Sequence, residues 1–215
     1  MQPPKSSICV ICGTRPATTT EHLPPRGFFK GSVGQFRTVP ACSECNNGSS
    51  KDDEVLRNYI SAQVGKQTTG AKHLWEMGAH KSLLRNTKIR SEFLSTVQEV
   101  EVPNETGATT TRITFLIPVS LYQRVFERVT RGLHFFHTGN ILPIDVPVQI
   151  FLLNNAPDLS SPDFRIFERH SIADNAFEYR FALDHEQQSN GVWLFIVHGS
   201  HWVQASTGAL VENAF

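Results

Sequence analysis

The clearest hydrophobic repeat lies past the middle of the chain. Leu121, Val125, Val129 and Leu133 recur at every fourth position, and Thr138-Gly139 follows them. This spacing places the four side chains on one face of an α-helix, and glycine is a common residue at a helix end. We therefore predict a helix over Val119–His137. Arginines at 124, 128 and 131 share another face of it, and a solvated face is the simpler interpretation than a phosphate-binding track.

Shorter patterns define the other elements. Helices are predicted at Asp52–Gln63, Ala71–Leu84 and Ile89–Val97, and a hairpin at residues 100–117, where Ile113, Phe115 and Ile117 alternate. Strands are predicted at 17–21, 36–40, 148–153, 164–168, 177–183, 191–197 and 202–205. The aromatic residues of the last strands suit an antiparallel sheet packed on the long helix. The fold class is therefore α+β, with a small module over 1–68 and a mixed helix and antiparallel-sheet domain over 69–215.

Composition limits the class of protein. The 215 residues are 40% hydrophobic and 19% charged, which is typical of a globular chain. The longest apolar runs, such as Val192–Val197, are too short to cross a bilayer, and the N-terminus lacks the apolar core of a signal peptide. We expect a cytoplasmic protein with no membrane association. In that compartment closely spaced cysteines are more often metal ligands than disulfides.

Charge divides unevenly along the chain. The net charge is zero overall, but residues 1–51 hold six basic and two acidic side chains, so this segment carries +4 and the remainder −4. A positive segment is what a surface that meets phosphates requires. Candidate nucleic-acid contacts are Arg26, Lys30, Arg37 and Lys51, although each also suits a solvated surface.

All four cysteines fall in this positive segment, as two C-x-x-C pairs: Cys9 with Cys12, and Cys42 with Cys45. Four thiolates at this spacing predict a closed, tetrahedral structural zinc site. A segment of about 40 residues buries too little apolar surface to hold itself together, so the metal would supply the cross-link. A staple without chemistry is the simplest reading of the cysteines; iron or a redox dithiol is the alternative.

Between the cysteine pairs lies Glu21-His22, and Asn46-Asn47 follows the last cysteine. If one zinc binds both pairs, these side chains fall near one another. An imidazole with a pKa near 6.5 can take a proton from water at neutral pH. Carboxylate and amide oxygens are suitable ligands for a Mg²⁺ or Mn²⁺ ion that stabilises a phosphodiester transition state. The histidines at 134, 137, 170, 185, 198 and 201 are assigned to structure.

Residues 9–54 resemble HNH endonucleases of the four-cysteine type, in which C-x-x-C, an acidic residue with histidine and a nearby proline, and C-x-x-C followed by His or Asn occur in this order. EHLPPRGFF (Glu21 to Phe29) is also similar to a group of bacterial HNH proteins. The resemblance implies a ββα-metal (treble-clef) module with Zn²⁺ on Cys9, Cys12, Cys42 and Cys45. It also implies His22 as general base and a catalytic cation on Glu21 and Asn46.

The sequence departs from the family in three places. The family usually has an orienting Asn a few residues before the third cysteine; here Gln35, Phe36 and Arg37 occupy that neighbourhood, so either Gln35 substitutes for it or no residue does. Glu21 replaces the commoner Asp, and either Asn46 or Asn47 fits as the second ligand. We therefore expect a metal-dependent endonuclease acting on DNA rather than RNA, in which residues 69–215 select the substrate, form a homodimer or bind a protein partner. The alternative is a non-catalytic zinc finger that binds nucleic acid or protein.

Overall fold

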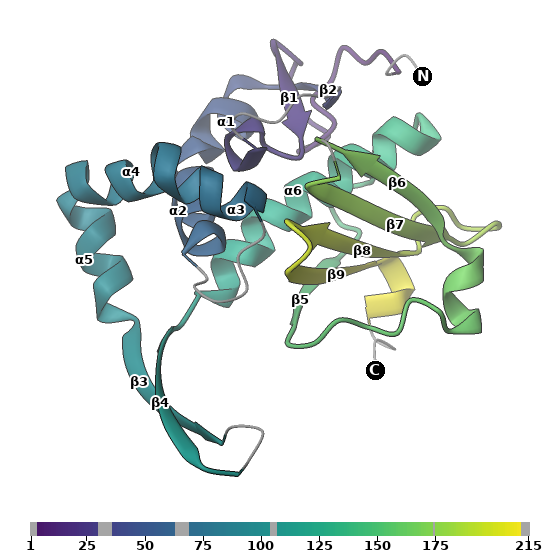
Figure 1. The fold of residues 1–215 in the computed structure, drawn as a ribbon. Helices are drawn as coiled ribbons and strands as arrows, with labels where there is room; N and C mark the ends of the chain where they lie inside the picture. Colours follow the sequence, from purple (N-terminus) through teal and green to yellow (C-terminus); the bar gives the residue numbers. More distant parts are fainter. Residues whose placement is uncertain (1–3, 30–35, 63–68, 104–106, 174, 212–215) are drawn as a thin grey trace.

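One long helix, α6 (Val119–Thr138), lies at the centre of the computed structural model of this chain. The structure describes residues 4–29, 36–62, 69–103, 107–173 and 175–211. Figure 1 shows α6 running between the N-terminal elements and a five-stranded sheet. The predicted fold class, a mixture of helices and antiparallel strands, is confirmed.

Helix α6 forms where the four-residue repeat predicted it. Leu121, Val125, Val129 and Leu133 are all buried, and the helix ends at Gly139, whose φ of 74° is the left-handed conformation that glycine adopts most easily. The expectation of a solvated arginine face is wrong for two of the three side chains. Arg128 and Arg131 are only 5% and 3% exposed, because the N-terminal elements cover this face and the loop after α6 supplies carbonyl acceptors to Arg131.

The sheet beside α6 is antiparallel, in the order β5-β9-β8-β7-β6. Its strands are β5 (Val148–Leu153), β6 (Glu168–Ile172), β7 (Phe177–Leu183), β8 (Gly191–Val197) and β9 (His201–Thr207). Alternate residues of β7 and β8, among them Tyr179, Trp193 and Phe195, are fully buried. Phe195 also contacts Phe126 of α6, with 5.3 Å between the ring centroids. The predicted packing of aromatic strands on the long helix is thus confirmed.

One predicted strand is wrong. Residues 162–166 form a 3₁₀ helix, η4 (Pro162–Ile166), and the edge strand β6 begins only at Glu168. Pro162 suits the first turn of a helix, and the Ser161 side chain caps that turn by accepting from the Asp163 N–H. Ser161 and Pro162 therefore begin a helical turn just before the residues for which a strand was predicted.

The N-terminal elements form a ribbon followed by helices. Strands β1 (Thr19–Leu23) and β2 (Arg37–Ala41) pair antiparallel, with Glu21 opposite Val39, and the 3₁₀ helix η1 (Arg26–Phe29) follows β1. After β2 come α1 (Ser43–Asn46), the 3₁₀ helix η2 (Asn47–Ser49) and α2 (Ser50–Ser61). Asp52 and Asp53 occupy the first turn of α2, where acidic side chains suit the helix dipole.

A projecting unit connects α2 to α6. It consists of α3 (Thr69–Leu74), a π-helical stretch (Trp75–Ala79), α4 (His80–Arg85), α5 (Thr87–Ser95) and the hairpin of β3 (Val97–Pro103) with β4 (Thr109–Phe115). Figure 1 shows the hairpin extending away from the rest of the molecule. The predicted helix over Ile89–Val97 is too long, because Val97 already pairs with Phe115 in the hairpin.

Both parts of the chain share one set of buried residues. It runs from the cysteine-bearing segment through α6 to the sheet, and includes Val10, Leu23, Leu56, Val129 and Phe195. The glycine at position 132 lets α6 pack tightly against Leu23 of β1, because a Cβ on Gly132 would lie 2.5 Å from Cδ1 of Leu23. The predicted division between 1–68 and 69–215 stays a prediction, since residues 63–68 lie outside the described ones.

Candidate metal centre and the surrounding site

The four cysteines come together as a possible metal centre. One sulfur from each of Cys9, Cys12, Cys42 and Cys45 lies within 4.8 Å of the others. Four sulfurs around zinc, each at about 2.3 Å, would be separated by about 3.8 Å. The donor set and the separation fit a closed four-thiolate zinc site, so the part of the prediction that concerns these cysteines is confirmed to the extent that they can share one metal.

The local backbone explains why the sulfurs converge. Gly13 has a φ of 68°, and its N–H donates to the carbonyl of Cys9 at 2.8 Å, which closes the first C-x-x-C turn. Cys42 caps α1 by accepting from the N–H of Cys45 at 3.4 Å. Both turns point backbone amides at sulfur, which is the arrangement that stabilises thiolates.

Arg15 contacts the cysteine cluster, which the sequence analysis did not predict. Its Nε donates to the sulfur of Cys42 at 3.2 Å and its NH2 group donates to Cys45 at 3.3 Å, and it also forms an ion pair with Glu44. Burial opposes ionisation of Cys12, yet backbone amides of Thr14 and Arg15 lower the pKa of that thiol to about 5. A guanidinium beside a thiolate cluster compensates its negative charge. The sequence signal that could have predicted this contact is a basic residue three positions after Cys12.

Glu21 lies in an unexpected environment. Its side chain is buried, and its Oε1 is 3.8 Å from Nε of Arg128 on α6. Asp53 of α2 binds the same guanidinium through its Oδ1. Burial raises the pKa of Glu21 to about 7, with Arg128 opposing this shift and Asp53 adding to it. Among the described residues, Glu21 Oε2 has no hydrogen-bond partner.

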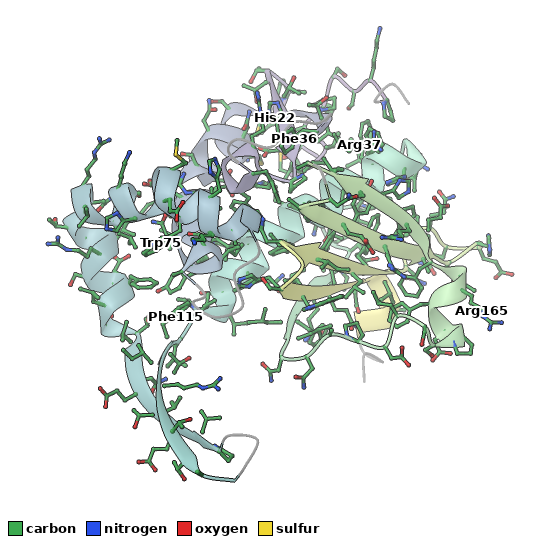
Figure 2. The ribbon with its side chains drawn as sticks, in the orientation of Figure 1. His22, Phe36, Arg37, Trp75, Phe115 and Arg165 are labelled. Carbon is green, nitrogen blue, oxygen red and sulfur yellow. The ribbon has the colours of Figure 1, made fainter. Side chains whose placement is uncertain are left out.

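His22 follows Glu21 in β1, so the two side chains leave opposite faces of the strand. The imidazole is half-buried and lies edge-on to Phe36, with 6.5 Å between the ring centroids. Figure 2 labels both side chains on the N-terminal module. Burial, and then the charge of Arg26, lower the pKa of His22. The imidazole is therefore unprotonated at neutral pH, as a general base requires.

Asn46 joins the end of α1 to β1. Its Nδ2 donates to the carbonyl of Thr20 at 3.0 Å and to Oγ1 of Thr19 at 3.1 Å. Asn47, the first residue of η2, is exposed, and its Nδ2 donates to Oγ of Ser43 in α1. The first asparagine thus lies beside the strand that carries the predicted catalytic pair. In the described part of the chain, however, no hydrogen bond or ion pair joins the side chains of Glu21, His22 and Asn46.

The candidate nucleic-acid contacts differ in exposure. Arg26 is exposed and lies 5.8 Å from the centroid of the Phe36 ring, and Lys51 is exposed on α2. Arg37 is half-buried, with its guanidinium carbon 5.0 Å from the centroid of the Phe136 ring. Lys30, and the family departure at Gln35, lie outside the described residues.

Comparison of this chain with protein-family models, curated proteins and solved structures gave no match. The class that the residues themselves define is an α+β protein with a cluster of four cysteines that could hold a metal ion. No helix in the described ranges combines the length and apolar character needed to cross a membrane.

Proposed function

We propose that this protein is a metal-dependent, HNH-type endonuclease that hydrolyses phosphodiester bonds, most readily in DNA. In this proposal the predicted N-terminal module, residues 1–68, is a zinc-stapled ββα (treble-clef) module. The observation that carries the proposal is His22, an unprotonated imidazole on a short β-ribbon whose second strand leads directly into Cys42 and Cys45. The sequence resemblance assigns the same residue as the base.

His22 has the surroundings that proton abstraction requires. The neutral ring accepts a proton from the attacking water, and the edge of Phe36 limits its motion. Arg26, exposed beside the same ring system, supplies a positive charge for a substrate phosphate. Asn46 holds the first half of β1 against α1, so the histidine sits on a strand fixed at both edges.

Glu21 and Asn46 are the proposed holders of the catalytic Mg²⁺ or Mn²⁺ ion. The unpartnered, buried Oε2 of Glu21 is a suitable oxygen donor. Such an ion would supply positive charge to the phosphorane oxygens and the leaving oxygen. Arg128 already gives partial compensation to Glu21, so we expect cation binding at this position to be weak and to improve as pH rises above 7.

The burial of Glu21 against Arg128 favours one other function. A carboxylate that serves as a structural partner of α6 is the feature of a non-catalytic zinc finger, whose module would bind nucleic acid or protein through its positive surface. This alternative uses the same cysteines and differs only in whether His22 and Glu21 take part in chemistry.

A cleavage assay separates the two functions. Purified full-length protein is incubated with supercoiled plasmid and with single-stranded RNA, in Mg²⁺ or Mn²⁺, alongside His22→Ala. His185→Ala is the matched control, since His185 is an exposed histidine in the C-terminal sheet region. We expect wild type and the control to nick plasmid and the His22 variant to lose at least about 100-fold of the rate.

Two outcomes would contradict the nuclease. Undiminished cleavage by the His22 variant would exclude the proposed base and point to a contaminant. Binding of nucleic acid without cleavage under any divalent cation would favour the zinc-finger module instead.

A further inference from the structure

A second group of potential metal ligands lies outside the cysteine-bearing segment. It consists of His137 in the last turn of α6 and Glu168 and His170 on β6. One ligand atom from each residue lies within 4.8 Å of the other two. The sequence analysis assigned both histidines to structure, because 29 residues lie between the end of the helix and the start of the strand, and no short motif joins them.

The fold brings these three residues together for simple reasons. Glu168 and His170 are two positions apart on one strand, so their side chains leave the same face of the sheet. That face carries Tyr179 and Phe181, the pairing partners of His170 and Glu168 on β7. Helix α6 packs across this face, and its last turn places the His137 ring 4.7 Å from the His170 ring, centroid to centroid.

The two imidazoles are held in fixed orientations. Nε2 of His137 is 2.9 Å from the Tyr179 hydroxyl, and the His137 ring lies 4.4 Å from the Phe181 ring between centroids. His170 stacks on Tyr179 at 5.0 Å with an interplanar angle of 17°. A hydrogen bond to one nitrogen of a histidine is the usual way in which a protein orients a metal ligand.

One imidazole nitrogen in this cluster is buried without a hydrogen bond in the described part of the chain. Nε2 of His170 is buried and has no hydrogen-bond partner among the described residues. Oε2 of Glu168 lies 3.5 Å from it. A buried, unpaired imidazole nitrogen costs free energy unless something binds it. A cation placed between the carboxylate and this nitrogen would satisfy both.

We propose that His137, Glu168 and His170 form a second metal site, which binds a zinc-class divalent ion with two nitrogens and one carboxylate oxygen. Two histidines and one carboxylate are a ligand set that leaves a coordination position for water. The site opens to solvent through Glu168, whose side chain is 68% exposed, so an ion can enter without unfolding. None of the three proposed ligands belongs to the proposed nuclease, so this site can succeed or fail independently of it.

Arg37 is the charge that opposes this site. Its guanidinium carbon lies 5.0 Å from the centroid of the Phe136 ring, beside His137, so a positive charge stands close to the proposed site. A positive neighbour lowers the affinity for a cation by Coulomb repulsion. We therefore expect Zn²⁺ to bind here more weakly than at the four cysteines, and replacement of Arg37 by Gln to tighten binding.

Metal stoichiometry on the full chain tests the proposal. Weakly bound metal is first removed from the protein with a mild chelator that leaves the cysteine-bound zinc in place. The protein is then titrated with Zn²⁺ and analysed for metal content. We expect wild type to take up a second ion, whereas Glu168→Gln and His170→Gln should bind it at least about 10-fold more weakly. His185→Gln, at an exposed histidine on the same part of the chain, should behave as wild type.

Both test positions are on an edge strand, so the variants are expected to keep the fold, which circular dichroism checks. Titration with Co²⁺ gives an independent readout, because an ion held by nitrogen and oxygen lacks the intense sulfur-to-metal absorption of the cysteine site. A wild-type protein that takes up no second ion, or a second ion retained by His170→Gln with unchanged affinity, would overturn the proposal.

Discussion

Nε of Arg128 on α6 lies 3.8 Å from Oε1 of Glu21 on β1, and both side chains are at most 5% exposed. Asp53 of α2 binds the same guanidinium, so three elements from two parts of the chain meet at one buried charge. This cluster connects the cysteine-bearing module to the central helix, and it places the residue that the sequence marks as a metal ligand in a structural ion pair.

Replacing Arg128 should be far more damaging than replacing Arg124, one helical turn earlier. Arg128→Met leaves two carboxylates near the core without their cation, which costs about 3–5 kcal/mol in the free energy of unfolding. Arg124 pairs with Asp52 from an exposed position, so Arg124→Met should cost less than about 1 kcal/mol. Urea denaturation measures both. Equal losses would show that the buried pairs carry no special weight.

The contact of Gly132 with Leu23 predicts a specific coupling. In Gly132→Ala the added methyl overpacks the core against Leu23, and the net loss should be about 1–2 kcal/mol despite the better helix propensity of alanine. A second change, Leu23→Ala, should make the same glycine substitution nearly neutral. Gly48→Ala is the control, since a Cβ there meets nothing within 4 Å. Additive effects in the double variant would contradict close packing at this point.

Arg15 should govern how firmly the cysteines hold zinc. Arg15→Ala removes two donors to thiolate sulfurs, and zinc release to a coloured chelator should become about 10-fold faster or more. Arg26→Ala removes another exposed positive charge of the same module and should leave the release rate unchanged. If both variants release zinc at the wild-type rate, the guanidinium contacts are not part of the metal centre.

Asn46 and Asn47 allow a matched test of structure. Asn46→Asp replaces the donor to the Thr20 carbonyl by an acceptor, so the free energy of unfolding should fall by about 1–3 kcal/mol. Asn47 is exposed at the start of η2, so Asn47→Asp should change the free energy of unfolding little. Denaturation of both variants decides whether Asn46 fixes β1. A cleavage assay on the same proteins then reports whether its side-chain oxygen also serves a cation.

The buried histidine at position 201 should lower the free energy of unfolding as the pH falls. It is buried, with Nε2 3.2 Å from the carbonyl of Ile60 and Nδ1 3.4 Å from the Tyr122 hydroxyl. Burial, the largest cause, lowers its pKa to about 4, below the ordinary value of 6.5. Because the unfolded chain binds the proton first, the stability due to His201 is complete above pH 6.5 and is lost as pH falls toward about 4.

Urea unfolding at several pH values between these limits checks the sign. The free energy of unfolding of wild type should decrease with falling pH more steeply than that of His201→Gln, while the exposed-site variant His185→Gln should follow wild type. Parallel curves for wild type and His201→Gln would assign the acid sensitivity to other groups.

Short-range sequence signals determined much of the fold. The four-residue repeat placed α6 to within one residue, and runs rich in apolar and aromatic residues placed β5, β7 and β8 with the bounds that the structure has. These patterns depend on one-sided burial along a regular element, which local sequence encodes directly. The two C-x-x-C pairs likewise predicted a shared metal centre, since each pair sets its own local geometry.

Other features were decided only by the tertiary structure. The sequence around Arg128 predicts a solvent-exposed residue, because the local pattern does not indicate that α2 and β1 bring carboxylates close to it. His137 and His170 read as unrelated, because a helix end and an edge strand meet only after the sheet has formed. Local periodicity reports which side of an element is buried; which charges and ligands meet across elements depends on how the elements pack.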